Sequence, residues 1–297
     1  GLEWMRKSAD AGDAEGMRNL GNFLLRYEGT KDPREALAWL ERSATNGNVD
    51  ALLDLGSTYE HGHGNVPVDK AKAVQWYRKG AELGAPESIN NYARFLRTGE
   101  GGVAKDEKAA RDLFEKAVAG GSNYAKCNLG EMLDDGDGGD PDRQRAWKLM
   151  VDAADSGNEI CQLEVGYDLR YAKNYEQKFD LDRARHYLEL SAAQGDELSR
   201  GLVAELNIIQ NEGDIGKASA ARTVLQKVAD EPGVPAHIQY VMGVECMLGR
   251  GGPVDYPCAR QRFLKAADAG LPVAEQMMGF LALSGIGGRQ DFGQAES

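Results

Sequence analysis

Features of several common protein classes are missing from this sequence. No apolar run approaches the roughly 18 residues that span a bilayer, and no signal peptide is visible at the start of the chain. Four cysteines in 297 residues are too few for a disulfide-stabilised secreted domain. Four histidines leave little material for a metal site. Strand-like alternation is missing too. The sequence therefore disfavours a membrane-spanning protein, a disulfide scaffold, a metalloprotein and a sheet protein.

Positive charge is the minority sign. The chain has 35 lysine and arginine residues against 47 aspartate and glutamate residues, which gives a formal net charge of −12. Nucleic acid and anionic membrane surfaces are repelled on average by such a chain. We therefore expect no nucleic-acid partner and no membrane insertion. The composition is otherwise ordinary, and 42% hydrophobic residues are enough to form a core.

Glycine, by contrast, is abundant, with 37 residues against nine prolines. Marker residues recur along the whole chain at steps of 35 to 38 residues: Gly12, Gly47, Gly84, Gly121, Gly157, Gly195, Pro232 and Gly270. So regular a spacing indicates that one small unit is copied and stacked. Stacked repeats present a long surface to a partner, and few of them carry out chemistry.

The residues after each marker follow the pattern of a helix. The residue four positions after the marker is small, the residue eight positions after it is apolar, the ninth is glycine or alanine, and the twelfth is apolar. In the second copy these residues are Ala51, Leu55, Gly56 and Tyr59. Such offsets place the side chains on one stripe of a helix. A glycine inside a helix costs about 1 kcal/mol relative to alanine. Its recurrence therefore predicts a second helix packed very closely at that point.

The residues before each marker predict that second helix. An aspartate stands fifteen positions before the marker, an alanine eleven before and a large apolar residue seven before. Aspartate suits a helix start because its carboxylate accepts hydrogen bonds from free backbone N–H groups. The aspartates at this position are Asp32, Asp69, Asp106, Asp142, Asp180 and Asp255. The marker glycine would end the helix in a left-handed conformation, so each unit is expected to be helix, loop, helix and tight turn.

Three segments depart from the regular unit within what we expect to be a single repeat domain, 1–297. Residues 1–11 fit the trailing half of a repeat, and because the chain starts with Gly1 rather than methionine, we expect a trimmed or processed chain. The repeat near 196–232 fits worst, with its capping aspartate displaced to Asp214. Either the stack is irregular there or, as we favour, a loop carries an insertion. Residues 272–297 read as a truncated repeat that stops where a second helix would begin.

The four cysteines fit two interpretations. Cys246 and Cys258 lie on the two predicted helices of one unit, across a short loop, where a disulfide is one alternative. In the other, all four cysteines, including Cys127 and Cys161 on neighbouring first helices, are small buried thiols. We favour the second interpretation.

The best-preserved copy, from Gly47 to Gly84, reads GNVDALLDLGSTYEHGHGNVPVDKAKAVQWYRKGAELG. Its pattern, G-x-x-x-A-x-x-x-L-G-x-x-Y, then a glycine-rich loop, then D-x-x-K-A-x-x-W-Y-x-K, resembles the Sel1-like repeat family. The resemblance implies an all-α fold, a right-handed α/α superhelical solenoid of about eight helix–loop–helix repeats. It also implies an adaptor or scaffold in a bacterial cytoplasm or periplasm. Some members resemble immunity proteins that neutralise secreted toxins.

In such arrays the first helices line a concave face, where we expect a protein or peptide partner to bind. The outward positions of these helices carry mixed charge in the early units and aromatic or aliphatic groups in the later ones. The candidate partner-binding residues are Leu163, Tyr167, Arg170, Tyr171, Ile208, Tyr240, Val244 and Met247. Exposed apolar groups at this density mark interaction sites. The alternative, which we weigh somewhat higher, is that curvature buries them or that a missing C-terminal segment covers them.

Catalytic chemistry finds little support in the sequence. His61 and His63 lie on one loop without the further ligands that a metal needs. The aspartates around Asp140 lack the spacing of an EF-hand and read as caps and loop residues. No nucleophile motif or paired-carboxylate cleft stands out. We expect no catalytic residue, metal, cofactor or small-molecule substrate. The leading hypothesis is a non-enzymatic binding module, and the alternative is an inhibitor of a cognate toxin.

Overall fold

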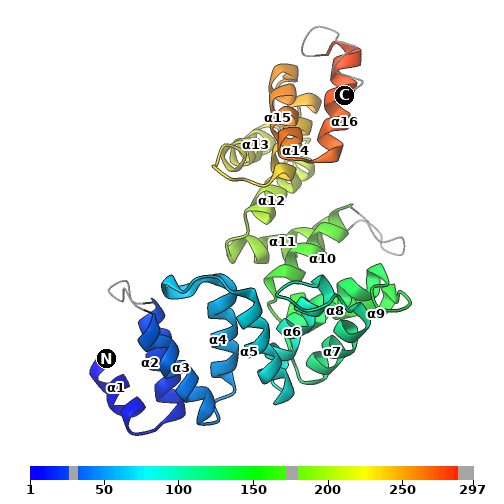
Figure 1. Ribbon diagram of the computed structural model, residues 1–297. Helices are drawn as coiled ribbons and strands as arrows, with labels where there is room; N and C mark the ends of the chain where they lie inside the picture. Colours follow the sequence, from blue (N-terminus) through cyan, green and yellow to red (C-terminus); the bar gives the residue numbers. More distant parts are fainter. Residues whose placement is uncertain (27–32, 172–179, 287–297) are drawn as a thin grey trace. The chain divides into compact units, whose positions relative to one another are not determined.

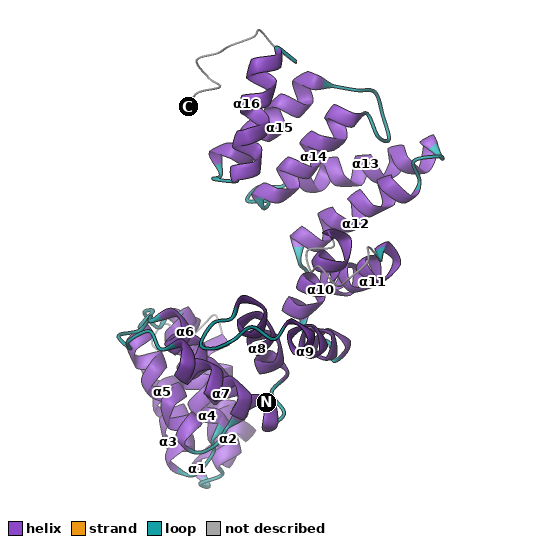
Figure 2. Cartoon of the chain, turned by 90° about the vertical axis from the view of Figure 1, so that its right-hand side faces the viewer, coloured by secondary structure: helices purple, strands orange, loops and turns teal. Residues whose placement is uncertain are grey.

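The computed structural model describes residues 1–26, 33–171 and 180–286. Within these ranges the chain forms sixteen α-helices and one short 3-10 helix (Figure 1). The described residues contain helices and loops but no strand (Figure 2). The prediction of an all-α repeat fold is confirmed. The expected helix cap at Asp32 and the expected helix start at Asp291 lie outside the described residues.

The chain divides into two compact units. Unit 1, residues 1–158, contains α1 (Leu2–Asp10), α2 (Ala14–Arg26), α3 (Arg34–Thr45), α4 (Asp50–His61), the 3-10 helix η1 (His63–Asn65), α5 (Lys70–Glu82), α6 (Pro86–Thr98), α7 (Glu107–Ala119), α8 (Asn123–Asp135) and α9 (Arg143–Asp155). Unit 2, residues 159–297, contains α10 (Glu159–Tyr171), α11 (Leu181–Ala193), α12 (Glu197–Gln210), α13 (Ile215–Ala229), α14 (Ala236–Leu248), α15 (Tyr256–Asp268) and α16 (Pro272–Ser284). Even-numbered helices are the first helices of the repeats, and odd-numbered helices are the second helices.

Each first helix with a described partner packs against the second helix of its own repeat. A packing glycine lies at this contact in α2, α4, α8, α10 and α14, and an alanine takes its place in α6 and α12. A methyl group on Gly56 of α4 would come within 2.4 Å of the Tyr77 ring of α5. In unit 2 a methyl group on Gly243 of α14 would come within 2.7 Å of the Phe263 ring of α15. Neither position has room for a side chain, which confirms the close approach that the recurring glycine predicts.

Helix starts and ends follow the predicted cap chemistry. In six second helices the preceding aspartate accepts a hydrogen bond from the backbone N–H three residues on; these are Asp69, Asp106, Asp142, Asp180, Asp214 and Asp255. The marker Gly47 has a φ of 90°, which glycine adopts without strain. Where the marker is Pro232, whose ring forbids such a value, the next residue, Gly233, has a φ of 78°. The displaced cap at Asp214 was anticipated from the sequence.

The core of each unit is a row of side chains from equivalent repeat positions. The large residues seven positions before the markers are buried: Leu40, Tyr77, Phe114 and Met150 in unit 1, Leu188 and Phe263 in unit 2. Burial of apolar area at about 25 cal/mol per Å² stabilises each hairpin and its neighbour together. In the described part of the chain, no helix combines the length and apolar character that crossing a bilayer requires.

The cysteines differ from our expectation. Cys246 of α14 and Cys258 of α15 form a disulfide, with 5.9 Å between their Cα atoms. No cysteine among the described residues is a free thiol. The prediction of four buried thiols is therefore wrong. The physical reason for the 246–258 bridge is the short loop that returns the chain from α14 to α15, because it brings the two Cα atoms within the range that a disulfide spans.

Candidate binding surface

The first helices α10, α12 and α14 form one side of unit 2, here called the first-helix face, and α12 packs directly on α14. An ion pair between Arg170 of α10 and Glu205 of α12 joins residues 35 positions apart in the sequence. That separation is close to the repeat step. Equivalent positions of neighbouring first helices therefore lie side by side, and their side chains meet on this face.

Four rings from α10 and α14 gather on the first-helix face and are here called the aromatic cluster: Tyr167, Tyr171, His237 and Tyr240. The rings of Tyr167 and Tyr171, one helical turn apart, have centroids 4.5 Å apart. His237 lies 5.6 Å from Tyr167 and 6.0 Å from Tyr171, edge-on to both rings. Tyr240 lies 6.1 Å from His237. All four side chains are half-buried, so each keeps some surface in solvent.

Beneath the rings lies a charged network of two arginines and two glutamates. Arg170 pairs with Glu205 at 3.0 Å, and Arg250, in the loop after α14, pairs with Glu245 through two hydrogen bonds. Both carboxylates are deeply buried: Glu205 is 5% exposed and Glu245 is fully inaccessible. The Tyr171 hydroxyl donates to Glu205 at 3.4 Å and lies 3.3 Å from Nε2 of His237. The network therefore anchors Tyr171, whose ring in turn contacts Tyr167 and His237.

Burial sets the protonation of these groups. Loss of solvent raises the pKa of Glu205 and of Glu245, while their arginines act in the opposite direction. Burial, with the nearby charge of Arg170, lowers the pKa of His237 below its usual 6.5. Burial and neighbouring carboxylates raise the pKa of Tyr167 and of Tyr171. At neutral pH His237 is therefore a neutral imidazole, and Tyr167 and Tyr171 are protonated phenols.

Most of the predicted partner-binding residues lie where a partner could touch them. Leu163, Tyr167, Arg170 and Tyr171 of α10 and Tyr240, Val244 and Met247 of α14 are all half-buried. Three of the predicted tyrosines join the aromatic cluster, and Arg170 lies with its guanidinium 4.7 Å from the Tyr171 ring centroid. Leu163, Val244 and Met247 stand on the same helices outside the cluster.

Ile208 corrects the sequence reading. Its side chain is fully buried, with 0% of its surface exposed. The helix that carries it, α12, packs against α11, α13 and α14, so this position has no open side. The prediction of an exposed contact at Ile208 is wrong, and Ile208 belongs to the core of unit 2.

Sequence reasoning missed two further members of the site. His237 stands six residues before the packing glycine Gly243, and Glu205 stands one residue after Ala204, which occupies the packing position of its own repeat. Both positions face outward on a first helix, as those of Tyr167 and Tyr240 do. Neither residue is apolar, so an apolar pattern does not identify them, although their register relative to the packing position does.

The first helices of unit 1 carry paired charges at the corresponding places. Arg18 of α2 pairs with Asp54 of α4 at 2.6 Å, and Arg97 of α6 pairs with Glu131 of α8 at 2.8 Å. Arg94 of α6 also pairs with Glu60 of α4. Each of these ion pairs joins helices one repeat apart. This face of unit 1 is therefore a ladder of mutually neutralised groups, in keeping with the mixed charge read from the sequence.

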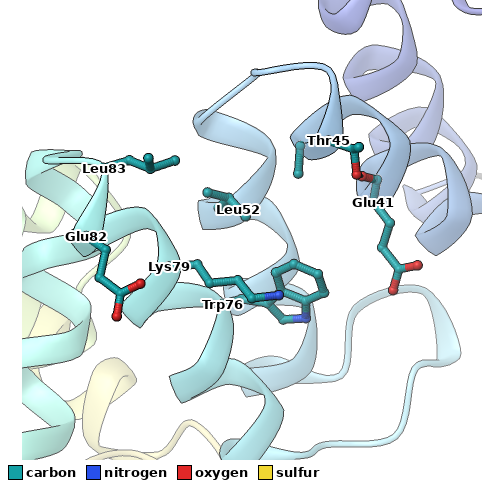
Figure 3. Close-up of a pocket in the computed structure, with 8 residues that line it drawn as sticks. Glu41, Thr45, Leu52, Trp76, Lys79, Glu82 and Leu83 are labelled. Atoms are coloured by element: carbon teal, nitrogen blue, oxygen red, sulfur yellow. The ribbon is translucent and has the colours of Figure 1, made fainter.

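A pocket of about 530 Å³ lies elsewhere in unit 1, between the second helices α3 and α5 (Figure 3). Leu52 of α4 lies between the two helices, with Thr45 on one side and Trp76 on the other (Figure 3). The Nζ atom of Lys79 stands 4.1 Å from the centroid of the Trp76 ring. The indole face is thus already covered by the chain's own lysine, so this pocket is a weaker candidate than the aromatic cluster. The described residues hold no group of three or more side chains suited to a metal ion.

Comparison with known sequences identifies the repeats. The family model described as Sel1 repeat matches seven segments: residues 1–13, 14–48, 49–84, 86–122, 123–158, 161–196 and 236–271. The segment between the last two matches contains α12 and α13. An F-box protein of Arabidopsis thaliana is 40% identical over 57 residues, which cover 19% of this chain and 16% of that protein.

Solved structures share the architecture. The structure of c5321, described as a protective antigen of uropathogenic Escherichia coli with an SLR fold, superposes with a TM-score of 0.74 at 26% identity. That match covers 99% of this chain and 62% of the E. coli chain, so the present chain is the shorter of the two. A Sel1 repeat protein of Oxalobacter formigenes gives a TM-score of 0.52 at 25% identity, over 99% of this chain and 83% of that one.

Proposed function

The chain belongs to the Sel1 repeat family, and we propose that it is a non-enzymatic protein-interaction module that binds a protein or peptide on the first-helix face of unit 2. The repeat fold is typical of proteins that bind other proteins. The finer assignment, to one face of one unit, rests on the aromatic cluster.

The aromatic cluster supports the proposal because its side chains are partly exposed and already held in place. Tyrosine supplies a large contact area at a small entropic cost, since only two torsions must be fixed, and interface hot spots are rich in such residues. Ring contacts and the buried charged network already fix these side chains before a partner arrives. A preorganised surface loses little entropy on binding. The paired charges of unit 1 lack this combination.

The test begins with random linear peptides selected on the immobilised full chain. Their affinities are then measured by fluorescence anisotropy for the wild type and for Tyr167→Ala. Tyr167 is chosen because the hydroxyl that donates to the buried Glu205 is that of Tyr171. We expect about a tenfold loss of affinity, the effect of about 1.4 kcal/mol at an interface hot spot.

The matched control is Tyr256→Ala, which removes an exposed tyrosine from the second helix α15 of the same unit. This variant should bind within about twofold of the wild type. Thermal unfolding followed by circular dichroism checks that both variants fold. Equal affinity of all three proteins, or failure to select any peptide, would count against the proposal.

The inhibitor hypothesis stays a prediction. It requires a dissociation constant of about 1 nM or below for one cognate enzyme, and loss of that enzyme's activity when the two proteins are mixed at equal concentration. An adaptor would bind its partner and leave the partner's activity intact. An activity assay of the bound partner therefore separates the two functions.

A further inference from the structure

Resting on the proposed function, we propose that the partner of unit 2 is a basic segment that places an arginine or lysine side chain on the aromatic cluster.

The cluster already accepts one cation of the chain. The guanidinium of Arg170 lies 4.7 Å from the Tyr171 ring centroid, within the range of a cation–π contact. Among the cation–π contacts of the described residues, none involves Tyr167 or Tyr240. Both rings are half-buried, so they are partly shielded from water yet reachable. Partial desolvation strengthens the attraction between a ring face and a cation.

Negative charge surrounds Tyr167. Glu164 and Asp168 stand three residues before it and one residue after it on α10, and Glu205 lies beside the cluster on α12. Burial raises the pKa of the Tyr167 phenol, these three carboxylates raise it further, and Arg170 opposes them. Among the charged groups that act on this phenol, the carboxylates outnumber Arg170, so their combined field at the ring is negative. Such a field attracts a cation to the adjacent ring faces.

An anionic segment fits this surface poorly. Both arginines of the charged network are already paired, Arg170 with Glu205 and Arg250 with Glu245. His237 adds no positive charge, because burial and Arg170 lower its pKa. A partner carboxylate would meet neutral rings and buried carboxylates, with no free cation in the network to pair with it. The net charge of −12 on the whole chain acts in the same direction during encounter.

The test uses the peptides selected on the full chain. Each arginine or lysine of an enriched peptide is replaced singly, arginine by citrulline and lysine by glutamine, and the binding to wild type, Tyr167→Leu and Tyr167→Phe is measured. Citrulline keeps the shape of arginine and removes its charge. Phenylalanine keeps the ring face, whereas leucine removes it and keeps apolar bulk.

We expect the selected peptides to be enriched in arginine and lysine. At one basic position of the peptide, replacing arginine by citrulline or lysine by glutamine should weaken binding to the wild type and to Tyr167→Phe about tenfold. The same replacement should weaken binding to Tyr167→Leu less than about twofold. This loss of coupling in the leucine variant is the signature of a cation on the ring. Circular dichroism melting confirms that the variants compared are folded.

The two proposals fail in different ways. If the selected peptides depend on Tyr167 but no basic position matters, or if citrulline binds as well as arginine, the basic partner is wrong and the binding surface stands. If no peptide is selected, or if no selected peptide responds to Tyr167→Ala, the binding surface itself is wrong and the basic partner falls with it.

Discussion

Unit 1 and unit 2 use the same helical hairpin to present different chemistry on their first helices. In unit 1 the side chains at this face are arginines and carboxylates that neutralise one another across repeats. In unit 2 the same register holds the aromatic cluster, above carboxylates buried with their arginines. The packing glycines and capping aspartates do not differ between the units. The repeat thus fixes where a side chain stands, and the residue at that place decides what the surface can bind.

The largest expected difference between the units concerns their buried charges. Arg250 and Arg97 have similar side-chain exposure, 19% and 21%, but Glu245 is 0% exposed and Glu131 is 33% exposed. Arg250→Met should therefore destabilise the protein by about 3 kcal/mol, because it leaves a buried carboxylate without its partner. Arg97→Met should cost about 1 kcal/mol or less. Urea unfolding of both variants measures the difference, and equal losses would remove this distinction between the units.

The next expected effect concerns the packing glycines. Alanine at Gly243 would press its methyl group against the stiff ring of Phe263 at 2.7 Å, whereas alanine at Gly130 would meet the flexible Met150 at 2.5 Å. Gly243→Ala should destabilise by about 2 to 3 kcal/mol. Gly130→Ala should cost less, about 1 to 2 kcal/mol, because Met150 is more flexible than a ring, while its Cγ and the Ala146 carbonyl oxygen at 3.2 Å limit the movement. Thermal melts report both values. A gain of stability in Gly243→Ala would contradict the close packing of α14 on α15.

A smaller effect is expected for two tyrosine hydroxyls. Tyr171 donates to Glu205 in unit 2, and Tyr77 donates to Glu60 at 2.8 Å in unit 1. Phenylalanine at either position keeps the ring and removes one hydrogen bond to a carboxylate. Each change should cost about 1 to 2 kcal/mol. Denaturant unfolding tests this similarity, and an unchanged stability in Tyr171→Phe would show that its hydroxyl does not support the cluster.

The smallest effect concerns pH. The pKa of His237 is lowered in the folded protein, so between 6.5 and that lower value the unfolded chain binds more protons at this site. Stability from this group is full above 6.5 and is lost as the pH falls through the folded value. His237→Gln should not show this loss. The difference in free energy of unfolding between wild type and variant should therefore change by at most about 1.4 kcal/mol per pH unit.

Unfolding of wild type and His237→Gln at a series of pH values measures this effect. The carboxylates of Glu205 and Glu245, whose raised pKa values give the opposite slope, are common to both proteins and cancel in the difference. A difference between wild type and variant that does not change with pH would contradict the neutral imidazole.

The hairpins themselves were predictable because their determinants are local and recur. An aspartate such as Asp69 caps whatever helix follows it, and a glycine such as Gly56 in an apolar stripe has one packing explanation. Burial on the first-helix face was less accessible, because it depends on contacts between repeats. Ile208 has the register of Arg170, four residues after the packing position, yet its side chain is fully buried on a helix that packs against three others. The disulfide was the less favoured of the two interpretations, because the residues around Cys246 in the sequence suit a small buried thiol equally well.

The central claim is that binding takes place on α10 and α14 of unit 2 and not on the first helices of unit 1. Hydrogen–deuterium exchange of the full chain, with and without a saturating selected peptide, tests it most directly, because bound segments open less often. We expect slower exchange in peptides covering residues 159–171 and 236–248, with no change in residues 50–61 and 86–98. Protection confined to the helices of unit 1, or spread equally over both units, would contradict the account.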